Sequence, residues 1–369
     1  MSTESAIRPP VLVRYRRAFD KVGPPIFLGI VPVLFFAWVL IFEVHHGDVA
    51  VDFHHELYPE AKLVAHGTNP YPPPDADLSS GTNTIWPIAA VLPFLPLSYL
   101  SPGVADGLMT AFVIATLLAT LAVLGVRDWR VFGATLVWPG VINAVQTANL
   151  TLPLGLLAAL VWRYRRVMIV PGIALGVALA AKFFLWPLAV WLAAVRRWRE
   201  ALLACVLAIA SLGLILPFAS LGDYFHLVRN LSDTFDGESY TIYGFLTDAG
   251  VTSGAARAAN LVVGIALLAL AWRRHSFALT MGAALVLSPI VWLHFLALLV
   301  VPFAIASPTF SAIWLLPLVT WLAPGTYNGR PWQSGLVLAF LGVAMLWCAR
   351  RETAPRPRQR PTVATARAS

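Results

Sequence analysis

The charged residues of this 369-residue chain lie in a few short stretches that are separated by long apolar runs. Only 12% of the residues are charged and 59% are hydrophobic, against about 25% and 45–50% in soluble domains. So few charges cannot cover the surface of a soluble protein of this size. We therefore predict an all-α polytopic membrane protein with about 10–13 membrane helices, several of them short and broken.

The net charge of +8 comes from basic clusters that lie between the apolar runs, at 14–21, 127–130, 163–166, 196–199, 273–274 and 350–351. Such clusters are typical of cytoplasmic loops in integral plasma-membrane proteins, so nucleic-acid binding is not expected. A membrane domain over 26–350 is predicted, between a cytoplasmic segment 1–25 and a disordered, basic cytoplasmic tail 351–369.

The acidic residues gather in two other places. Of the 18, seven lie in 43–83 and five in 220–255. Because these stretches lack the basic clusters, both are predicted to be outer loops. The asymmetry indicates an active site on the extracytoplasmic side.

The first outer loop contains the densest set of polar residues. Phe53, Leu57 and Ala61 recur at helical spacing, which predicts an amphipathic helix on the membrane surface. Asp52 precedes this helix, where an aspartate acts either as a helix cap or as a general base for an incoming hydroxyl. Asp48 and Glu56 are further candidates for the base.

Other polar residues of this loop are weaker candidates for a functional role. The adjacent histidines His54 and His55 point about 100° apart on a helix, which does not favour a shared metal ion. No metal and no cofactor are predicted. Asn69 and Tyr71, in a proline-rich turn, are expected to contact an acceptor or to position the loop, as are the two histidines.

Two apolar stretches, 131–162 and 167–195, each lie between basic clusters and are too short for two full crossings. We expect each to form a hairpin of short helices, with bends at 146–149 and 183–187. Residues 84–100 are expected to re-enter the membrane rather than cross it. Broken helices around a polar site occur in transporters and in membrane-embedded enzymes.

Lys182 lies inside the second of these apolar stretches. An ionisable residue within a membrane indicates function, although a lysine side chain can also extend to the interface. A lipid phosphate fits both its charge and its depth. His294, Gln146 and Asn149 are either satisfied buried residues or hydrogen-bonding partners of the same phosphate or sugar.

The order of these motifs resembles that of the membrane glycosyltransferases of the C-type fold, and most nearly glycosyltransferase family 87. The motifs that carry the resemblance are Asp52-Phe53, a Gly-x-Asn-Pro-Tyr turn at 67–71, a proline-rich hairpin from 85, Gln-x-x-Asn at 146–149, Lys182, and Ser-Pro-x-x-Trp-x-His at 288–294. The proline hairpin departs from the usual Tyr-Pro-Pro, because here it opens Ile85-Trp86-Pro87.

The resemblance implies a polyprenyl-phosphate sugar as donor, with mannose favoured over a pentose. It also implies inverting transfer to a hydroxyl of a glycolipid or cell-envelope glycan. In this mechanism Asp52 is the base, and Lys182 and His294 bind the donor phosphate. A transporter or flippase of a lipid-linked or anionic solute is the alternative.

Overall fold

The computed structural model describes residues 22–80, 85–323 and 329–352, and these residues form helices without any strand. Most of the segment 1–25 and of the tail 351–369 lies outside these residues, so the predictions made for them stay open. The first helix already includes Val22 and the last helix continues to Glu352, slightly beyond the predicted limits of the membrane domain.

Four helices are long and apolar enough to cross a membrane: Val22–His46, which contains η1 (Ile26–Ile30) and α2 (Val31–His46), α5 (Pro102–Val123), α14 (Ser253–Arg274) and α17 (Pro331–Glu352). A bent pair, α7 (Pro139–Gln146) and α8 (Thr151–Arg163), turns by 118° and brings the number of candidate spans to five. These spans confirm a polytopic, all-helical membrane protein.

Six shorter apolar helical stretches complete the bundle: Ile88–Tyr99 (α4, Ile88–Val91, and η3, Leu92–Tyr99), α9 (Val170–Ala181), Phe183–Ala194 (η4, Phe183–Leu185, and α10, Pro187–Ala194), α15 (Phe277–Leu287), Leu293–Ala306 (η6, Leu293–Leu299, and α16, Val300–Ala306) and η7 (Ala312–Leu322). Several short helices begin at or next to a proline, because proline lacks the N–H that continuing a helix requires but fits its first turn. Pro139 and Pro187 begin α7 and α10 in this way.

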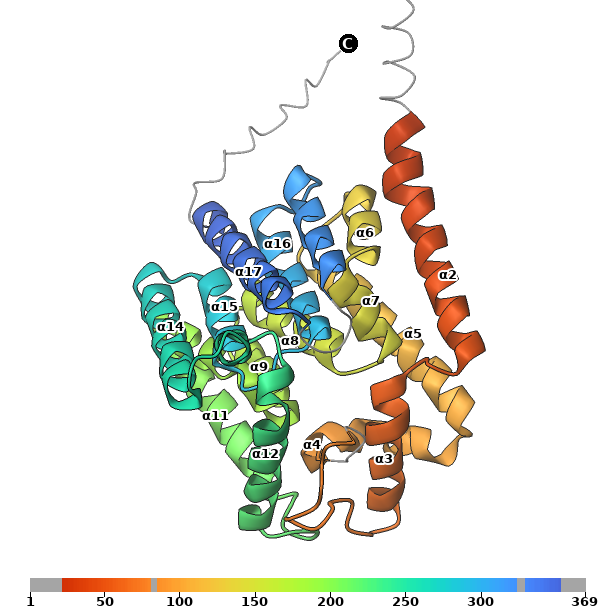
Figure 1. Ribbon diagram of the computed structural model, residues 1–369, viewed down its shortest axis with the longest axis vertical. Helices are drawn as coiled ribbons and strands as arrows, with labels where there is room; N and C mark the ends of the chain where they lie inside the picture. The colour runs from red at the N-terminus through yellow and green to blue at the C-terminus, as the bar shows by residue number, and fades with distance from the viewer. Residues whose placement is uncertain (1–21, 81–84, 324–328, 353–369) are drawn as a thin grey trace, which may run out of the picture.

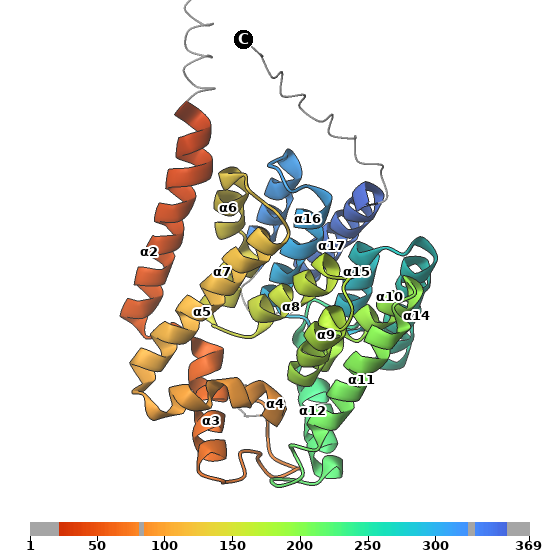
Figure 2. The same cartoon turned by 180° about the vertical axis from the view of Figure 1, so that it is seen from behind.

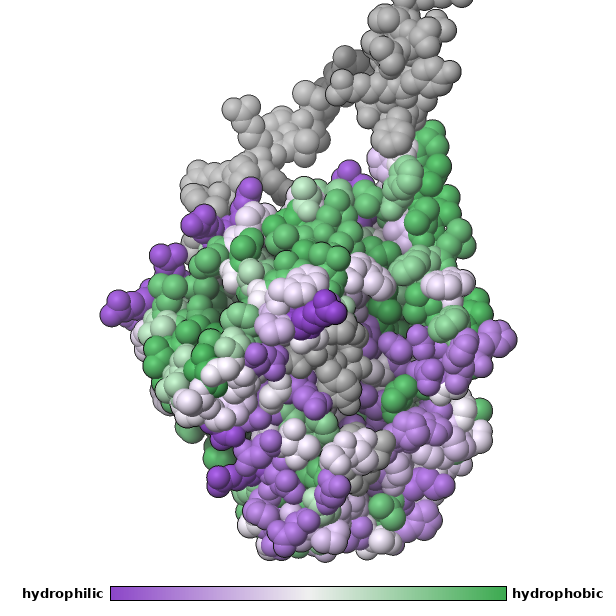
Figure 3. Space-filling view, viewed as in Figure 1, coloured by the Kyte–Doolittle hydropathy of each residue, from purple (hydrophilic) through white to green (hydrophobic). Residues whose placement is uncertain are grey.

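The remaining helices are α6 (Trp129–Leu136), α11 (Trp198–Leu212) and those of the two outer loops, namely η2 (Phe53–Leu57), α3 (Tyr58–Ala65), α12 (Leu221–Phe235), η5 (Asp236–Glu238) and α13 (Ile242–Asp248). The two ends of the described chain lie on one side of the molecule, and α3, α4 and α12 lie on the opposite side (Figures 1 and 2). On the face seen in Figure 3, hydrophobic residues cover the part around α2 and α14, whereas hydrophilic residues gather over α3 and α12.

Both stretches that were predicted to form hairpins are broken into short helices near the predicted bends. Between α7 and α8 the break lies at 147–150 and turns the chain by 118°, and between α9 and α10 it lies at 182–186. The helix predicted after Asp52 is also present, as η2 and α3. Its apolar face does not lie free for lipid, since Phe53, Leu57 and Ala61 are buried and Phe53 contacts the ring of Phe94 at 6.0 Å. Protein packing therefore replaces the membrane surface that the pattern suggested.

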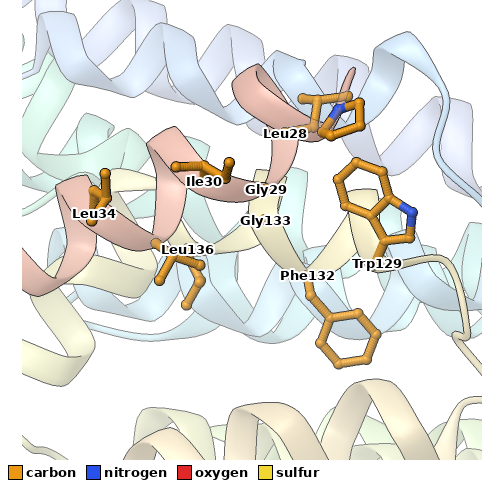
Figure 4. A pocket seen from close by; sticks show the side chains of 10 residues that line it. Leu28, Gly29, Ile30, Leu34, Trp129, Phe132, Gly133 and Leu136 are labelled. Atoms are coloured by element: carbon orange, nitrogen blue, oxygen red, sulfur yellow. The ribbon is translucent and has the colours of Figure 1, made fainter. Parts of the chain in front are cut away.

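Helix α2 stands at the edge of the bundle and packs mainly on α6. Beside this contact lies an apolar groove of about 760 Å³ (Figure 4), lined by Pro25, Leu28, Gly29, Ile30, Val33, Leu34, Trp129, Phe132, Gly133 and Leu136. The groove has no charged lining residue, and it lies at the end of α2 remote from the first outer loop.

Candidate active site

The first outer loop is fixed to the bend between α7 and α8 by backbone hydrogen bonds. The chain turns sharply because Ala148 adopts a left-handed conformation, with φ of 46°. The turn leaves the carbonyls of Gln146 and Thr147 free to accept from the N–H groups of Ala50 at 2.7 Å and Asp52 at 3.0 Å. Asp52 is thereby held directly on the bend.

The half-buried carboxylate of Asp52 faces Asn149. The Asn149 amide donates to Asp52 Oδ2 at 3.3 Å and to Thr147 Oγ1 at 2.7 Å. Asp52 makes no side-chain capping hydrogen bond to the helix that follows it. Burial raises the pKa of Asp52 to about 6, while the hydrogen bond from Asn149 and the charge of Lys182 act in the opposite direction. A carboxylate with this pKa is ionised, and able to accept a proton, near neutral pH.

Glu56 lies one helical turn beyond Asp52 and adds a second carboxyl group to the site. Its Oε2 accepts a hydrogen bond of 2.7 Å from the indole N–H of Trp86. Burial and the neighbouring charge of Asp52 raise the pKa of Glu56 to about 8, against the lowering effects of Trp86 and Lys182. Near pH 7 the pair therefore consists of one ionised and one largely neutral carboxyl group.

Lys182 brings the opposite charge to these two carboxyl groups. It follows the last residue of α9 in an extended conformation, at the break before η4. Its Nζ lies 4.8 Å from the centre of the Trp86 ring and 4.4 Å from that of Phe295. Its charge acts on both Asp52 and Glu56, yet within the part of the chain that the structure describes no carboxylate oxygen lies within 4.0 Å of it.

His294 lies in η6, next to the Phe295 ring that Lys182 contacts. Its ring stacks on Phe295 with centroids 4.9 Å apart, and the charge of Lys182 reaches it. His294 Nδ1 and the nearby Trp292 Nε1 are both buried, and neither has a hydrogen-bond partner among the residues that the structure describes. A buried polar atom without a partner costs about 1–3 kcal/mol, so these two atoms fit a site that receives a polar ligand.

Gln146 and Asn149, which were both predicted as candidate partners of the phosphate or sugar, face different residues in the structure. Asn149 contacts Asp52, whereas the Gln146 side chain bonds to Asn143 and Glu43. Asp52 therefore interacts with Asn149 and, through charge, with Lys182, which also acts on His294, whereas the Gln146 side chain has other partners.

The histidines of the first outer loop lie outside this cluster. His54 Nδ1 is 2.8 Å from Asp106 Oδ2, an interaction that ties the loop to α5, and His55 is exposed. The contact of His54 with Asp106 agrees with the loop-positioning alternative, and contact of either histidine with an acceptor stays a prediction.

The proline-rich turn also supports the loop. Asn69 Oδ1 accepts from the N–H of Tyr71 at 3.0 Å, and the Tyr71 hydroxyl donates to the carbonyl of Trp86 at 3.1 Å. Trp86 itself was not predicted as a site residue. Trp86 contacts Glu56, which lies 30 positions earlier in the sequence, and Lys182, which lies still further away in the sequence. No local sequence pattern therefore indicates these contacts.

The fold and the cluster together define an integral membrane protein whose polar, charged site lies where the acidic loop 43–83 meets broken helices. A family model described as glycosyltransferase family 87 matches residues 85–302, more than half of the chain. The chain belongs to glycosyltransferase family 87 and is a membrane glycosyltransferase. The match contains Trp86, Asn149, Lys182 and His294, while Asp52 lies before it. No curated protein and no solved structure matches the chain.

Proposed function

We propose that the protein transfers a sugar, with mannose favoured, from a polyprenyl-phosphate donor to a hydroxyl of a glycolipid or cell-envelope glycan on the extracytoplasmic side. The observation that carries this proposal is the convergence, at one half-buried place, of Asp52, a proton acceptor, and Lys182, a cation with no ion-pair partner among the described residues. Transfer from a phosphate-linked sugar needs both of these groups.

In the proposed reaction, Asp52 takes the proton of the acceptor hydroxyl as its oxygen attacks the anomeric carbon. A new glycosidic bond forms on one face of the sugar, and the bond to the phosphate oxygen breaks on the other, which inverts the configuration. The polyprenyl phosphate leaves with the bonding electrons, and Lys182 stabilises its charge. His294 and Trp292 offer buried polar atoms to the phosphate or the sugar.

The position of the site supports a lipid-linked donor. Lys182 follows an apolar helix, so a phosphate bound there would have its prenyl chain beside the apolar arms α9 and α10. The acceptor could reach the site from the hydrophilic face over α3 and α12, which lies away from the hydrophobic surface around α2 and α14 (Figure 3). Membership of a glycosyltransferase family favours this mechanism over transport.

The proposal is tested with the purified protein in nanodiscs and a panel of polyprenyl-phosphate sugars that includes mannose and pentose donors. Transfer of radiolabelled sugar to a glycolipid acceptor is expected with at least one donor, with release of polyprenyl phosphate. Nucleotide sugars serve as the comparison donors. Transfer from a nucleotide sugar, with none from any lipid-linked donor, would overturn the proposal.

A further inference from the structure

Trp86 connects three parts of the site. Its indole N–H donates to Glu56 at 2.7 Å, its ring face lies 4.8 Å from Lys182 Nζ, and its backbone carbonyl accepts from the Tyr71 hydroxyl at 3.1 Å. The side chain is buried. A residue fixed at its edge, at its face and at its backbone has little freedom to move.

The second outer loop also contributes to this arrangement. Tyr224, on α12, donates to the carbonyl of Ile85 at 3.4 Å, next to Trp86. The rings of Tyr71 and Tyr224 lie 5.2 Å apart, and both residues are buried. The backbone at Ile85–Trp86 is thus held by one tyrosine from each outer loop, while the hydrogen bond to Glu56 sets the direction of the indole N–H.

The position of Lys182 depends on the fixed position of Trp86. The ammonium group lies against two aromatic faces, Trp86 and Phe295, and in the described segments it has no carboxylate within ion-pair distance. Aromatic faces attract a cation without using its N–H donors in hydrogen bonds. The lysine therefore keeps its donors for another anion, and its place depends on the two rings.

We propose that Trp86 and Glu56 form a positioning pair, in which the Glu56 carboxyl group fixes the indole of Trp86 and the indole holds the Lys182 ammonium in place for the anionic phosphate group of the donor. The identity of that anion rests on the proposed function. The positioning itself rests on the contacts of Trp86, and it is specific to Trp86 because phenylalanine would keep the ring face but lose the N–H.

The first test separates donor binding from turnover in steady-state kinetics. Trp86→Phe and Glu56→Leu both break the indole bond, so each is expected to raise the donor KM about fivefold or more and to leave kcat within about twofold. Glu56→Gln keeps a carbonyl acceptor for the indole and is expected to retain a donor KM near that of the wild type below pH 7. Because the two residues act through one bond, the double variant Trp86→Phe/Glu56→Leu is expected to resemble the single variants.

Matched controls lie elsewhere in the chain. The Trp314 indole N–H donates to the carbonyl of Ser307 at 3.0 Å, and its ring packs on Trp138 and Phe303, so Trp314→Phe makes the same chemical change at a tryptophan that does not contact Lys182. Glu238 is an exposed carboxylate of the second outer loop, and Glu238→Gln controls for loss of charge. Both are expected to keep the wild-type donor KM. Equal effects of Trp86→Phe and Trp314→Phe would show general packing loss and overturn the positioning role.

A second test needs no donor. The chain has three lysines, Lys21, Lys62 and Lys182, and the exposed Lys62 is an internal reference for acylation by a small amine-reactive reagent. Trp86→Phe and Glu56→Leu are expected to raise the labelling of Lys182 relative to Lys62 about threefold or more, since the ring no longer covers the ammonium group firmly. Trp314→Phe is expected to leave the ratio unchanged.

The two tests distinguish failure of this inference from failure of the proposed function. A changed labelling ratio without transfer from any lipid-linked donor would support the positioning pair and contradict the proposed donor. Transfer from a lipid-linked donor, with unchanged labelling and unchanged KM in Trp86→Phe and Glu56→Leu, would overturn the positioning pair and leave the proposed function in place.

Discussion

The side-chain amide of Asn149 donates a hydrogen bond of 3.3 Å to the carboxylate of Asp52, which lies 97 positions earlier in the chain. The bond joins the first outer loop to the bend between two apolar helices. Two backbone bonds from Ala50 and Asp52 to this bend run beside it. The orientation of the proposed base is therefore set by the broken membrane helices and not by the loop alone.

If Asp52 is the base, Asp52→Asn should lower kcat by about 10²–10⁴-fold while donor binding remains, because the amide keeps the shape but cannot take a proton. Single-turnover transfer and binding of polyprenyl phosphate, measured on the same preparation, check this prediction. Asp48→Asn, in the same loop but exposed, is the control and should retain activity. An active Asp52→Asn enzyme would exclude Asp52 as the base.

The pH dependence of kcat/KM should also show whether Asp52 is the base. Asp52 accepts a proton only when ionised, so with its pKa raised to about 6 the rate constant kcat/KM should fall as the pH drops below about 6. Asn149→Ala removes a hydrogen bond that lowers this pKa, and the acidic limb should then move to higher pH. Asn230→Ala, which removes a bond to the carbonyl of Ala76 in the outer loops, should leave the limb in place. A limb that does not move in Asn149→Ala would contradict the assignment.

Donor affinity should also depend on pH, through Glu56. With its pKa raised to about 8, this group is mainly neutral at pH 7 and gains a negative charge above pH 8. That charge opposes a phosphate at Lys182, so the donor KM should rise above pH 8 in the wild type. Asp52 is already ionised there. Loss of the charge on Lys182 itself also weakens phosphate binding at high pH. The Glu56→Gln enzyme should therefore show a smaller rise than the wild type, and an identical rise in both would show that Glu56 does not contribute.

Lys182 should contribute to donor binding more than any other lysine. Lys182→Met removes the charge and keeps a flexible apolar side chain, and it should weaken binding of polyprenyl phosphate about tenfold or more. Lys62→Met removes an exposed lysine of α3 and should leave binding within about twofold. Binding is measured with the lipid in nanodiscs. Equal affinities of the two variants would remove Lys182 from the phosphate site.

The membrane class, the broken hairpins and the helix after Asp52 could be predicted because each depends on local apolar periodicity, proline and charge. Lys182 and His294 stood out because an ionisable residue in an apolar run is unusual. Gln146 and Asn149 stood out in the same way as polar residues at a bend, but their different partners depend on the left-handed turn at Ala148, which the sequence does not indicate.

Trp86 could not be predicted, for a different physical reason. A tryptophan in an apolar run is ordinary, and its role arises only when Glu56 and Lys182 approach it in the fold. The orphaned polar atoms of Trp292 and His294 are likewise visible only in three dimensions, because their sequence neighbours do not show which buried atoms lack a partner.

The last prediction concerns the packing of α2, which precedes the first outer loop. Gly133 on α6 lies so close to α2 that an added Cβ would clash with the carbonyl oxygen of Leu28. Gly133→Ala should therefore push the two helices apart and lower the free energy of unfolding by about 1–3 kcal/mol. Gly107→Ala, on α5, adds the same methyl group where no atom lies within 4 Å, and should not destabilise the protein. Thermal unfolding in detergent compares the two variants, and equal midpoints would show that the contact of α2 with α6 does not limit stability.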